Sequence, residues 1–419
     1  MGEMKPVDRD SIKFATELKE SAKSPIWPKL LTFWIVTRVW LTLWGLLCST
    51  LYPITPLEKQ VPIWPPTSSI GVWLSRLLLA PWDRWDVEHF QRIASVGYIS
   101  SEGTLAFQPL FPYLGKWVGA VFGGNSLLGM VLVGNIGSFF FLVSLYHLAE
   151  LDLPRKQAYR AAIYFMSLPA AFILFAPYTE SLFLLLSVIS LLMSRRGRWW
   201  LAGLAGGLAS LTRQQGLFLV VPLVWEFWDH SGRQLSSLFR NWRGIAGLTL
   251  TPVGYLVWIF YRAIVMNDVV LDFGNPQQIF YGLLLSPNSN KIVENQQFVP
   301  PWEALRLAIT HSSSSNTVDL LSGGVYLLLL ALVGRQLWQL RQSYFLYTII
   351  LLVISFSYST GVPKSYMGLP RHCMLAFPLV MPLAEMCRSL SGNMLITGVG
   401  LCFLMALSYF YFCHTVWVP

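Results

Sequence analysis

Long apolar runs recur along this chain from Leu30 almost to its C-terminus, and they restrict the fold more than any other feature. Of the 419 residues, 54% are hydrophobic and only 12% are charged, whereas a soluble domain carries about 25% charged residues. Backbone polar groups cannot bond to water inside a bilayer, so apolar runs of about 20 residues cross it as helices. The sequence therefore predicts an all-α polytopic membrane protein.

About eleven segments are predicted to cross the membrane. With that number of crossings, three basic clusters at residues 195–198, 233–243 and 335–341 all face the cytoplasm, in agreement with the positive-inside rule. The predicted segments are residues 30–51, 127–148, 161–176, 181–193, 199–211, 216–228, 245–265, 318–333, 345–358, 374–387 and 394–412.

We expect a single transmembrane domain, residues 30–419, preceded by a cytoplasmic tail at residues 1–29. Two long stretches, residues 52–125 and 266–317, are predicted to be external loops. The second of them is too polar to cross a bilayer.

The first of these loops is expected to hold interfacial helices. Residues 87–98 can form an amphipathic surface helix with Phe90, Ile93 and Ala94 on one side. Residues 107–122 contain two prolines and a lysine, and we expect them to lie at the interface or re-enter rather than to cross.

The net charge of +9 does not indicate a nucleic-acid-binding protein, because the basic residues fall in short clusters between apolar runs. The five cysteines have no metal-ligand spacing, and we expect them to be small buried side chains. Neither a zinc motif, a phosphate-binding loop nor a dinucleotide fingerprint occurs.

Residues 82–90 (Trp-Asp-Arg-Trp-Asp-Val-Glu-His-Phe) carry the strongest chemical signal. Acids beside a bilayer are costly unless they have a function or a partner. Asp86 and His89 are three residues apart and share a helix face, so the carboxylate can act as a general base beside the imidazole. Asp83 and Asp86 could instead hold a divalent cation, and the plainer alternative is a solvated loop with acids at a helix N-terminus.

Glu180 and Arg213 lie at predicted helix junctions. Glu180 could face the same cavity as Asp86, or it could be an acid in the first turn of a helix. The helices at 199–211 and 216–228 are each too short to cross, so their junction around Arg213 is predicted to lie in a polar cavity below the membrane surface.

Three cations are candidates for binding a phosphate, namely Arg213, Arg371 and Lys364. A guanidinium binds phosphate in a bidentate manner. The alternative for each arginine is a structural ion pair, and Arg38 within the first span is expected to be structural.

Part of the chain resembles a known family. Residues 85–90 are followed by Ile93-Ala94, Gly97-Tyr98 and residues 106–112 (Ala-Phe-Gln-Pro-Leu-Phe-Pro), an ordered pattern over about thirty residues. This pattern is similar to the PIG-V family, the second mannosyltransferase of GPI-anchor synthesis, together with its bacterial homologues.

Three shorter segments resemble the same family. Residues 176–181 (Ala-Pro-Tyr-Thr-Glu-Ser) match its Pro-Tyr-Ser-Glu-Ser turn, and residues 211–216 match its Thr-Arg-Ser-Asn-Gly segment, with Gln214 and Gln215 in place of Ser-Asn. Residues 370–378 match an Arg-aromatic stretch before Phe-Pro, with His372 replacing the aromatic residue. These departures leave the identity of the sugar and of the acceptor open.

The resemblance implies an inverting GT-C glycosyltransferase that takes a hexose, mannose-like, from a polyprenyl-phosphate sugar on the external face. It implies Asp86 as general base and Arg213, Arg371 and Lys364 as ligands of the donor phosphate. The remaining candidate substrate-binding residues are Trp85, Glu88, His89, Glu180, Gln214 and His372.

The expected partners are the donor, membrane lipids and a lipid, glycan or protein acceptor, without nucleic acid. A divalent cation is the one cofactor considered, at Asp83 and Asp86. Short loops suggest a multi-pass protein of a bacterial plasma membrane. The rival functions are a lipid-linked sugar transporter or flippase, and a non-catalytic assembly subunit. A transporter would carry charges near the middle of several spans or repeat-related broken helices.

Overall fold

The computed structural model describes residues 25–51, 69–234, 236, 240–268, 296–311, 313–362, 364–366 and 368–413. Most of the predicted tail and parts of both predicted external loops (residues 52–68 and 269–295) lie outside these ranges. Within them the structure is almost entirely helical, and a two-residue antiparallel ladder joins β1 (Gln297–Phe298) to β2 (Tyr358–Ser359).

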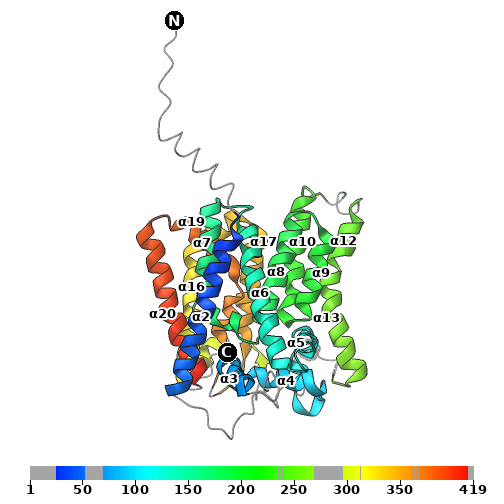
Figure 1. Ribbon diagram of the computed structural model, residues 1–419. Helices are drawn as coiled ribbons and strands as arrows, with labels where there is room; N and C mark the ends of the chain where they lie inside the picture. The colour runs from blue at the N-terminus through cyan, green and yellow to red at the C-terminus, as the bar shows by residue number, and fades with distance from the viewer. Residues whose placement is uncertain are drawn as a thin grey trace.

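Twelve of the described helices run roughly parallel to one another and form a bundle (Figure 1). They are α2 (Trp27–Leu51), α6 (Ser126–Ala149), α7 (Arg155–Met166), α8 (Glu180–Arg195), α9 (Trp199–Ser210), α10 (Val220–His230), α12 (Trp242–Leu248), α13 (Leu250–Phe260), α16 (Ser314–Leu340), α17 (Gln342–Ser357), α19 (Val380–Met386) and α20 (Leu390–Cys413).

The remaining elements connect these helices or lie across one end of the bundle. They are α3 (Ser69–Leu78), η1 (Ala80–Trp82), α4 (Asp86–Val96), η2 (Ser100–Glu102), η3 (Thr104–Ala106), α5 (Leu110–Ala120), η4 (Ala171–Phe175), η5 (Gln214–Leu219), the π-helical η6 (Tyr261–Val265), α15 (Pro301–Thr310), α18 (Leu369–Met374) and η8 (Phe377–Leu379).

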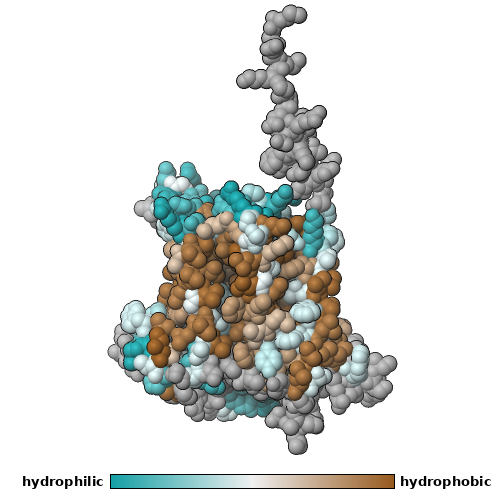
Figure 2. Space-filling model, turned by 90° about the vertical axis from the view of Figure 1, so that its left-hand side faces the viewer, coloured by the Kyte–Doolittle hydropathy of each residue, from teal (hydrophilic) through white to brown (hydrophobic). Residues whose placement is uncertain are grey.

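The surface of the bundle matches a bilayer. Figure 2 shows a broad hydrophobic side wall between two hydrophilic ends. Among the described residues, five helices are long and apolar enough to cross a membrane. They are residues 27–51, 126–149, 242–265, 315–340 and 390–413. The predicted all-α polytopic membrane fold is therefore confirmed.

The two ends of the bundle carry different elements. We call one the basic end, where the turn after α8, the α10–α12 connection and the end of α16 lie, and the other the α4 end, where α3, α4 and α5 lie (Figure 1). At the basic end Arg195 forms an ion pair with Asp152 at 2.6 Å, and Arg341 forms one with Glu226. These contacts place the 150–155 connection at the same end as the basic clusters. That placement agrees with the prediction that residues 107–122 do not cross, since α5 has only 11 residues.

Two predicted spans are not continuous helices. α7 ends at Met166, three residues before Pro169, so residues 161–176 contain a break and then η4. Residues 374–387 are divided among α18, η8 and α19, with Pro378 inside η8. Proline removes a backbone donor and clashes with the preceding turn, which explains both breaks.

Helix α4 follows the predicted amphipathic pattern. Val87, Phe90, Ile93 and Ala94 are buried along one side, as the spacing predicts. The Phe90 ring contacts Phe107 edge to face, with ring centroids 5.1 Å apart, and it also contacts Phe111 and Tyr178. This apolar face fixes the start of α4 against the bundle.

Candidate active site

Four charged side chains from four separate elements meet inside the bundle. Arg371 Nη1 lies 2.7 Å from Asp86 Oδ2, and Arg213 Nη1 lies 2.7 Å from Glu180 Oε1. A third contact joins the two pairs, because Arg371 Nε lies 3.7 Å from Glu180 Oε1. We call these four side chains the charge cluster. All four are buried, and their formal charges cancel, as buried ions require.

Asp86 is the first residue of α4, and the residue before it has an unusual backbone. Trp85 has φ 55° and ψ −120°, a positive-φ conformation outside the left-handed helical region that a bulky residue rarely adopts. Such strain costs about 1–3 kcal/mol and persists only where surrounding contacts impose it. Here the ion pair between Asp86 and Arg371 fixes the residue after Trp85. A hydrogen bond from the Tyr178 hydroxyl to the Arg84 carbonyl fixes the residue before it.

Glu180 is the first residue of α8 and is fully buried. Its neighbour Thr179 also belongs to the site, because Thr179 Oγ1 accepts a hydrogen bond of 2.7 Å from Arg213 Nη1. Glu180 contacts both arginines of the charge cluster. Its carboxylate is therefore better placed to hold the two guanidinium groups than to contact a substrate directly.

Arg213 lies in the break between α9 and η5, as the two short predicted helices require. Gly216 allows η5 to pack closely against the end of α9, since a Cβ added there would lie 2.3 Å from the backbone nitrogen of Ser210. The backbone at Arg213 is extended, with φ −151° and ψ 145°. The break thus places a guanidinium inside the bundle.

His372 adds an imidazole to the charge cluster. Its Nδ1 lies 3.1 Å from Arg213 Nη2. A guanidinium only donates hydrogen bonds, so Nδ1 must accept and the ring proton of neutral His372 is on Nε2. His372 and Arg371 are neighbours in α18, a short helix that begins after Gly368 with φ 76°.

The aromatic wall of the site includes Tyr178, which the sequence did not single out. The Arg371 guanidinium carbon lies 5.4 Å from the centre of the Tyr178 ring. The Tyr178 hydroxyl donates a hydrogen bond of 3.2 Å to the backbone oxygen of Arg84. Tyr178 and Thr179 both belong to the Pro-Tyr-Thr-Glu-Ser turn, which was the available sequence signal for them.

Other candidates lie outside the charge cluster. His89 is half-buried and stacks on Phe107, with ring centroids 5.5 Å apart, and Glu88 on the same helix is exposed. Lys364 is exposed on the connection between β2 and α18. Trp85 and Gln214 are half-buried next to Asp86 and Arg213 along the chain.

The two aspartates that could share a divalent cation have different partners. Asp83 Oδ1 accepts a hydrogen bond of 2.7 Å from Gln91 Nε2, whereas Asp86 pairs with Arg371. In the described part of the chain, no group of three or more metal-binding side chains gathers. Arg38, predicted to be structural, has its guanidinium carbon 4.7 Å from the Trp82 ring centre and donates to the Phe175 carbonyl.

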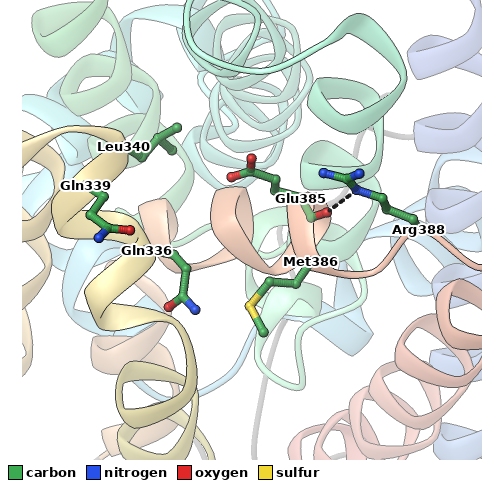
Figure 3. Close-up of a pocket in the computed structure, with 6 residues that line it drawn as sticks. All are labelled: Gln336, Gln339, Leu340, Glu385, Met386 and Arg388. Atoms are coloured by element: carbon green, nitrogen blue, oxygen red, sulfur yellow. Dashed lines mark hydrogen bonds between the residues drawn. The ribbon is translucent and has the colours of Figure 1, made fainter.

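A separate cavity of about 550 Å³ lies at the basic end, between the ends of α16 and α19 (Figure 3). It contains none of the candidate residues. Its lining residues are Gln336, Gln339, Leu340, Glu385, Met386 and Arg388.

Comparison with known proteins gives the family. The model of the family described as Mannosyltransferase (PIG-V) matches residues 29–245, slightly more than half of the chain. The chain belongs to the PIG-V mannosyltransferase family. The match includes Asp86, Glu180 and Arg213 and ends before Arg371.

Curated relatives of this PIG-V family member are mammalian. GPI alpha-1,6-mannosyltransferase 2 of Rattus norvegicus is 37% identical over 158 residues, which cover 35% of this chain and 32% of the relative. The Homo sapiens protein of the same name is 33% identical over 160 residues, covering 34% and 31%. The chain therefore spans about a third of the length of the curated relatives it matches.

Two solved structures show a distant likeness. One is ArnT from Cupriavidus metallidurans bound to undecaprenyl phosphate, with 14% identity, a TM-score of 0.45, and coverage of 74% of this chain and 57% of that one. The other is the Archaeoglobus fulgidus oligosaccharyltransferase tethered with an acceptor peptide, with 12% identity, a TM-score of 0.45, and coverage of 91% and 55%. Scores below 0.5 decide nothing about the chemistry of this chain.

Proposed function

We propose that this PIG-V family member is an inverting GT-C glycosyltransferase. It moves a mannose-like hexose from a polyprenyl-phosphate sugar to a hydroxyl of an envelope glycolipid, glycan or protein. The observation that carries the proposal is the charge cluster. A carboxylate at the start of α4 is held 2.7 Å from a guanidinium, with a second guanidinium in the same buried group.

Each charge in the cluster has a place in the proposed reaction. The acceptor oxygen attacks the anomeric carbon of the sugar, Asp86 takes the proton of that hydroxyl, and the bond between the anomeric carbon and the phosphate oxygen breaks. The lipid phosphate leaves with a negative charge. Arg213 and Arg371 stabilise that charge, which is the role of preorganised donors at a leaving group.

Glu180 explains how two arginines can remain in place while their ligand changes. It is buried and contacts both guanidinium groups. When Arg371 turns from Asp86 to a phosphate, Glu180 still provides a counter-charge. Breaking a buried ion pair without such a partner would cost about 3–5 kcal/mol.

The α4 end is proposed to face the outside of a bacterial plasma membrane. The basic clusters at residues 195–198 and 335–341 belong to the opposite end, as the positive-inside rule expects of the cytoplasmic side. A polyprenyl-phosphate sugar would reach the site from the bilayer, and the acceptor would reach it from the aqueous side.

Release of polyprenyl phosphate tests the proposal. Purified protein is incubated with polyprenyl-phosphate mannose and an envelope lipid extract, and free polyprenyl phosphate and mannosylated product are measured. Asp86→Asn should lower turnover by about 10²- to 10⁴-fold, the usual contribution of a general base. Glu102→Gln, an exposed acid at the same end, is the control and should keep wild-type turnover.

The rival transporter function predicts a different result in the same experiment. A flippase would move the lipid-linked sugar between leaflets of a vesicle without releasing polyprenyl phosphate. Asp86→Asn with full turnover, together with loss in Asp83→Asn or Glu180→Gln, would move the base to another residue.

A further inference from the structure

Helix α16 presents two buried polar side chains and a glycine to the segment that carries Arg371. Asn316, Asp319 and Gly323 are spaced at i, i+3 and i+7, so they lie on one face of the helix. Asn316 is fully buried, and Asp319 is 1% exposed. An ionisable side chain in a membrane helix is costly, and it usually marks a functional requirement.

Both polar side chains bind backbone groups just before the arginine. Asn316 Oδ1 accepts a hydrogen bond of 2.9 Å from the backbone nitrogen of Ser365. Asp319 Oδ1 accepts one of 3.1 Å from the backbone nitrogen of Leu369, the first residue of α18. The other oxygen of Asp319 is buried and has no hydrogen-bond partner among the described residues.

Gly323 completes this face by letting the same segment approach closely. A Cβ added at Gly323 would lie 2.7 Å from Leu369 Cδ2 and 2.9 Å from Phe356 Cζ. Leu369 is therefore held at its backbone by Asp319 and at its side chain against Gly323. Two residues further along the chain, Arg371 reaches Asp86.

We propose that Asp319 is a positioning residue for Arg371. Its carboxyl oxygen, with Asn316 and Gly323 beside it, sets where α18 begins and thereby where the Arg371 guanidinium and the His372 ring lie. This inference rests on the proposed function, because it assigns Arg371 to the departing phosphate. A misplacement of about 1 Å at a reacting group can cost about 10²-fold in rate. A fixed start of α18 therefore keeps the Arg371 guanidinium where the proposed reaction needs it.

A positioning role depends on the acceptor oxygen at residue 319 rather than on a charge. Asp319→Asn keeps an oxygen that can accept from the Leu369 N–H, whereas Asp319→Leu keeps the branched skeleton of four heavy atoms but is bulkier and has no acceptor. Asp319→Asn should therefore retain turnover close to wild type. Asp319→Leu should lower kcat by about 10²-fold with little change in KM for the donor.

Hydrogen exchange separates positioning from a general loss of stability. The Leu369 amide loses its acceptor in Asp319→Leu, so amides of residues 365–374 should exchange faster while those of α6 and α8 do not change. Asp319→Asn should exchange like wild type in the same segment.

A glycine pair provides a second test that leaves Asp319 intact. Gly323→Ala pushes Leu369 away and should also lower kcat, whereas Gly324→Ala adds a methyl where nothing lies within 4 Å and should have no effect. If Asp319→Leu does not fold, the comparison of Gly323→Ala with Gly324→Ala tests whether this face of α16 positions α18.

The proposal is overturned if Asp319→Asn loses as much turnover as Asp319→Leu, or if Gly323→Ala keeps wild-type kcat. Faster exchange throughout the bundle in Asp319→Leu would also overturn it, because the residue would then be a general stabiliser. If the wild-type protein transfers no sugar at all, the proposed function fails. The exchange comparison at residues 365–374 still reports whether Asp319 positions α18.

Discussion

At the scale of single residues, the site is defined by charges that satisfy one another inside an apolar bundle. Asp86 and Arg371 form one pair, Glu180 and Arg213 form the other, and Glu180 joins them. Removing one member leaves an uncompensated buried charge, which is more costly than the pair itself is stabilising.

Glu180→Gln should therefore destabilise the protein and lower donor affinity together. Loss of this carboxylate leaves Arg213 and Arg371 with one counter-charge, and breaking a buried pair costs about 3–5 kcal/mol. Thermal unfolding in detergent measures the loss. Glu303→Gln, which removes an exposed pair with Arg306, is the matched control and should leave the unfolding temperature unchanged. Equal unfolding temperatures for the two variants would contradict the account of Glu180.

Arg213→Ala and Arg371→Ala should lower kcat/KM, and the corresponding lysine variants should recover only part of that loss. Arg213 contacts Thr179, Glu180 and His372 at the same time through two nitrogens, and an ammonium group cannot reproduce that fork. Loss of a charge-assisted contact to the phosphate should cost about 2–4 kcal/mol in transition-state binding. The measurement is kcat/KM together with the thermal shift produced by polyprenyl phosphate. An alanine variant that keeps the wild-type shift would show that its arginine is only structural.

At the scale of elements, the close packing of α9 against α12 determines where the junction that carries Arg213 lies. Helix α9 packs against α12 through two glycines, and a Cβ added at Gly203 would lie 1.9 Å from the Gly247 carbonyl oxygen. α9 ends three residues before Arg213. The distance between these helices therefore bears on the position of the guanidinium.

Gly203→Ala should force α9 and α12 apart and lower both stability and transfer. Overpacking of a tight contact costs about 1–3 kcal/mol. Gly398→Ala in α20 adds the same methyl where nothing lies within 4 Å, and it should behave like the wild type. The unfolding temperature and the turnover of the two variants are compared. If Gly203→Ala leaves both at the wild-type value, the contact between α9 and α12 is not as tight as this prediction requires.

The sequence predicts the elements that depend on local patterns, but not the contacts between distant segments. Apolar runs place the helices, and the spacing of Phe90 and Ile93 gives the buried face of α4, because these are local patterns. Asp319 was not identified, since a single acid near the start of an apolar run looks like a helix end. Its partner Leu369 is 50 residues away. Lys364 stays a predicted phosphate ligand, and its exposed position on the connection between β2 and α18 could not be derived from the sequence.

At the scale of the whole molecule, opposite ends of the bundle carry different ionic groups. The charge cluster is built from α4, α8 and α18 and from the α9–η5 break. The basic end has its own network, in which Arg195 and Arg341 both contact Glu226. This second network ties α8 and α10 to the α16–α17 connection, far from the proposed chemistry.

The different ends of the bundle predict how the protein is oriented in the membrane. The basic end should face the cytoplasm and the α4 end the outside, because lysines and arginines are retained on the cytoplasmic side. Single cysteines are placed at two exposed neutral positions, Gln234 at the basic end and Ser101 at the α4 end, in a background without the five native cysteines. In intact cells, an impermeant thiol reagent should label Ser101→Cys and not Gln234→Cys, and permeabilised cells should label both. The reverse pattern would place Asp86 on the cytoplasmic side, and the proposed orientation of the enzyme would be wrong.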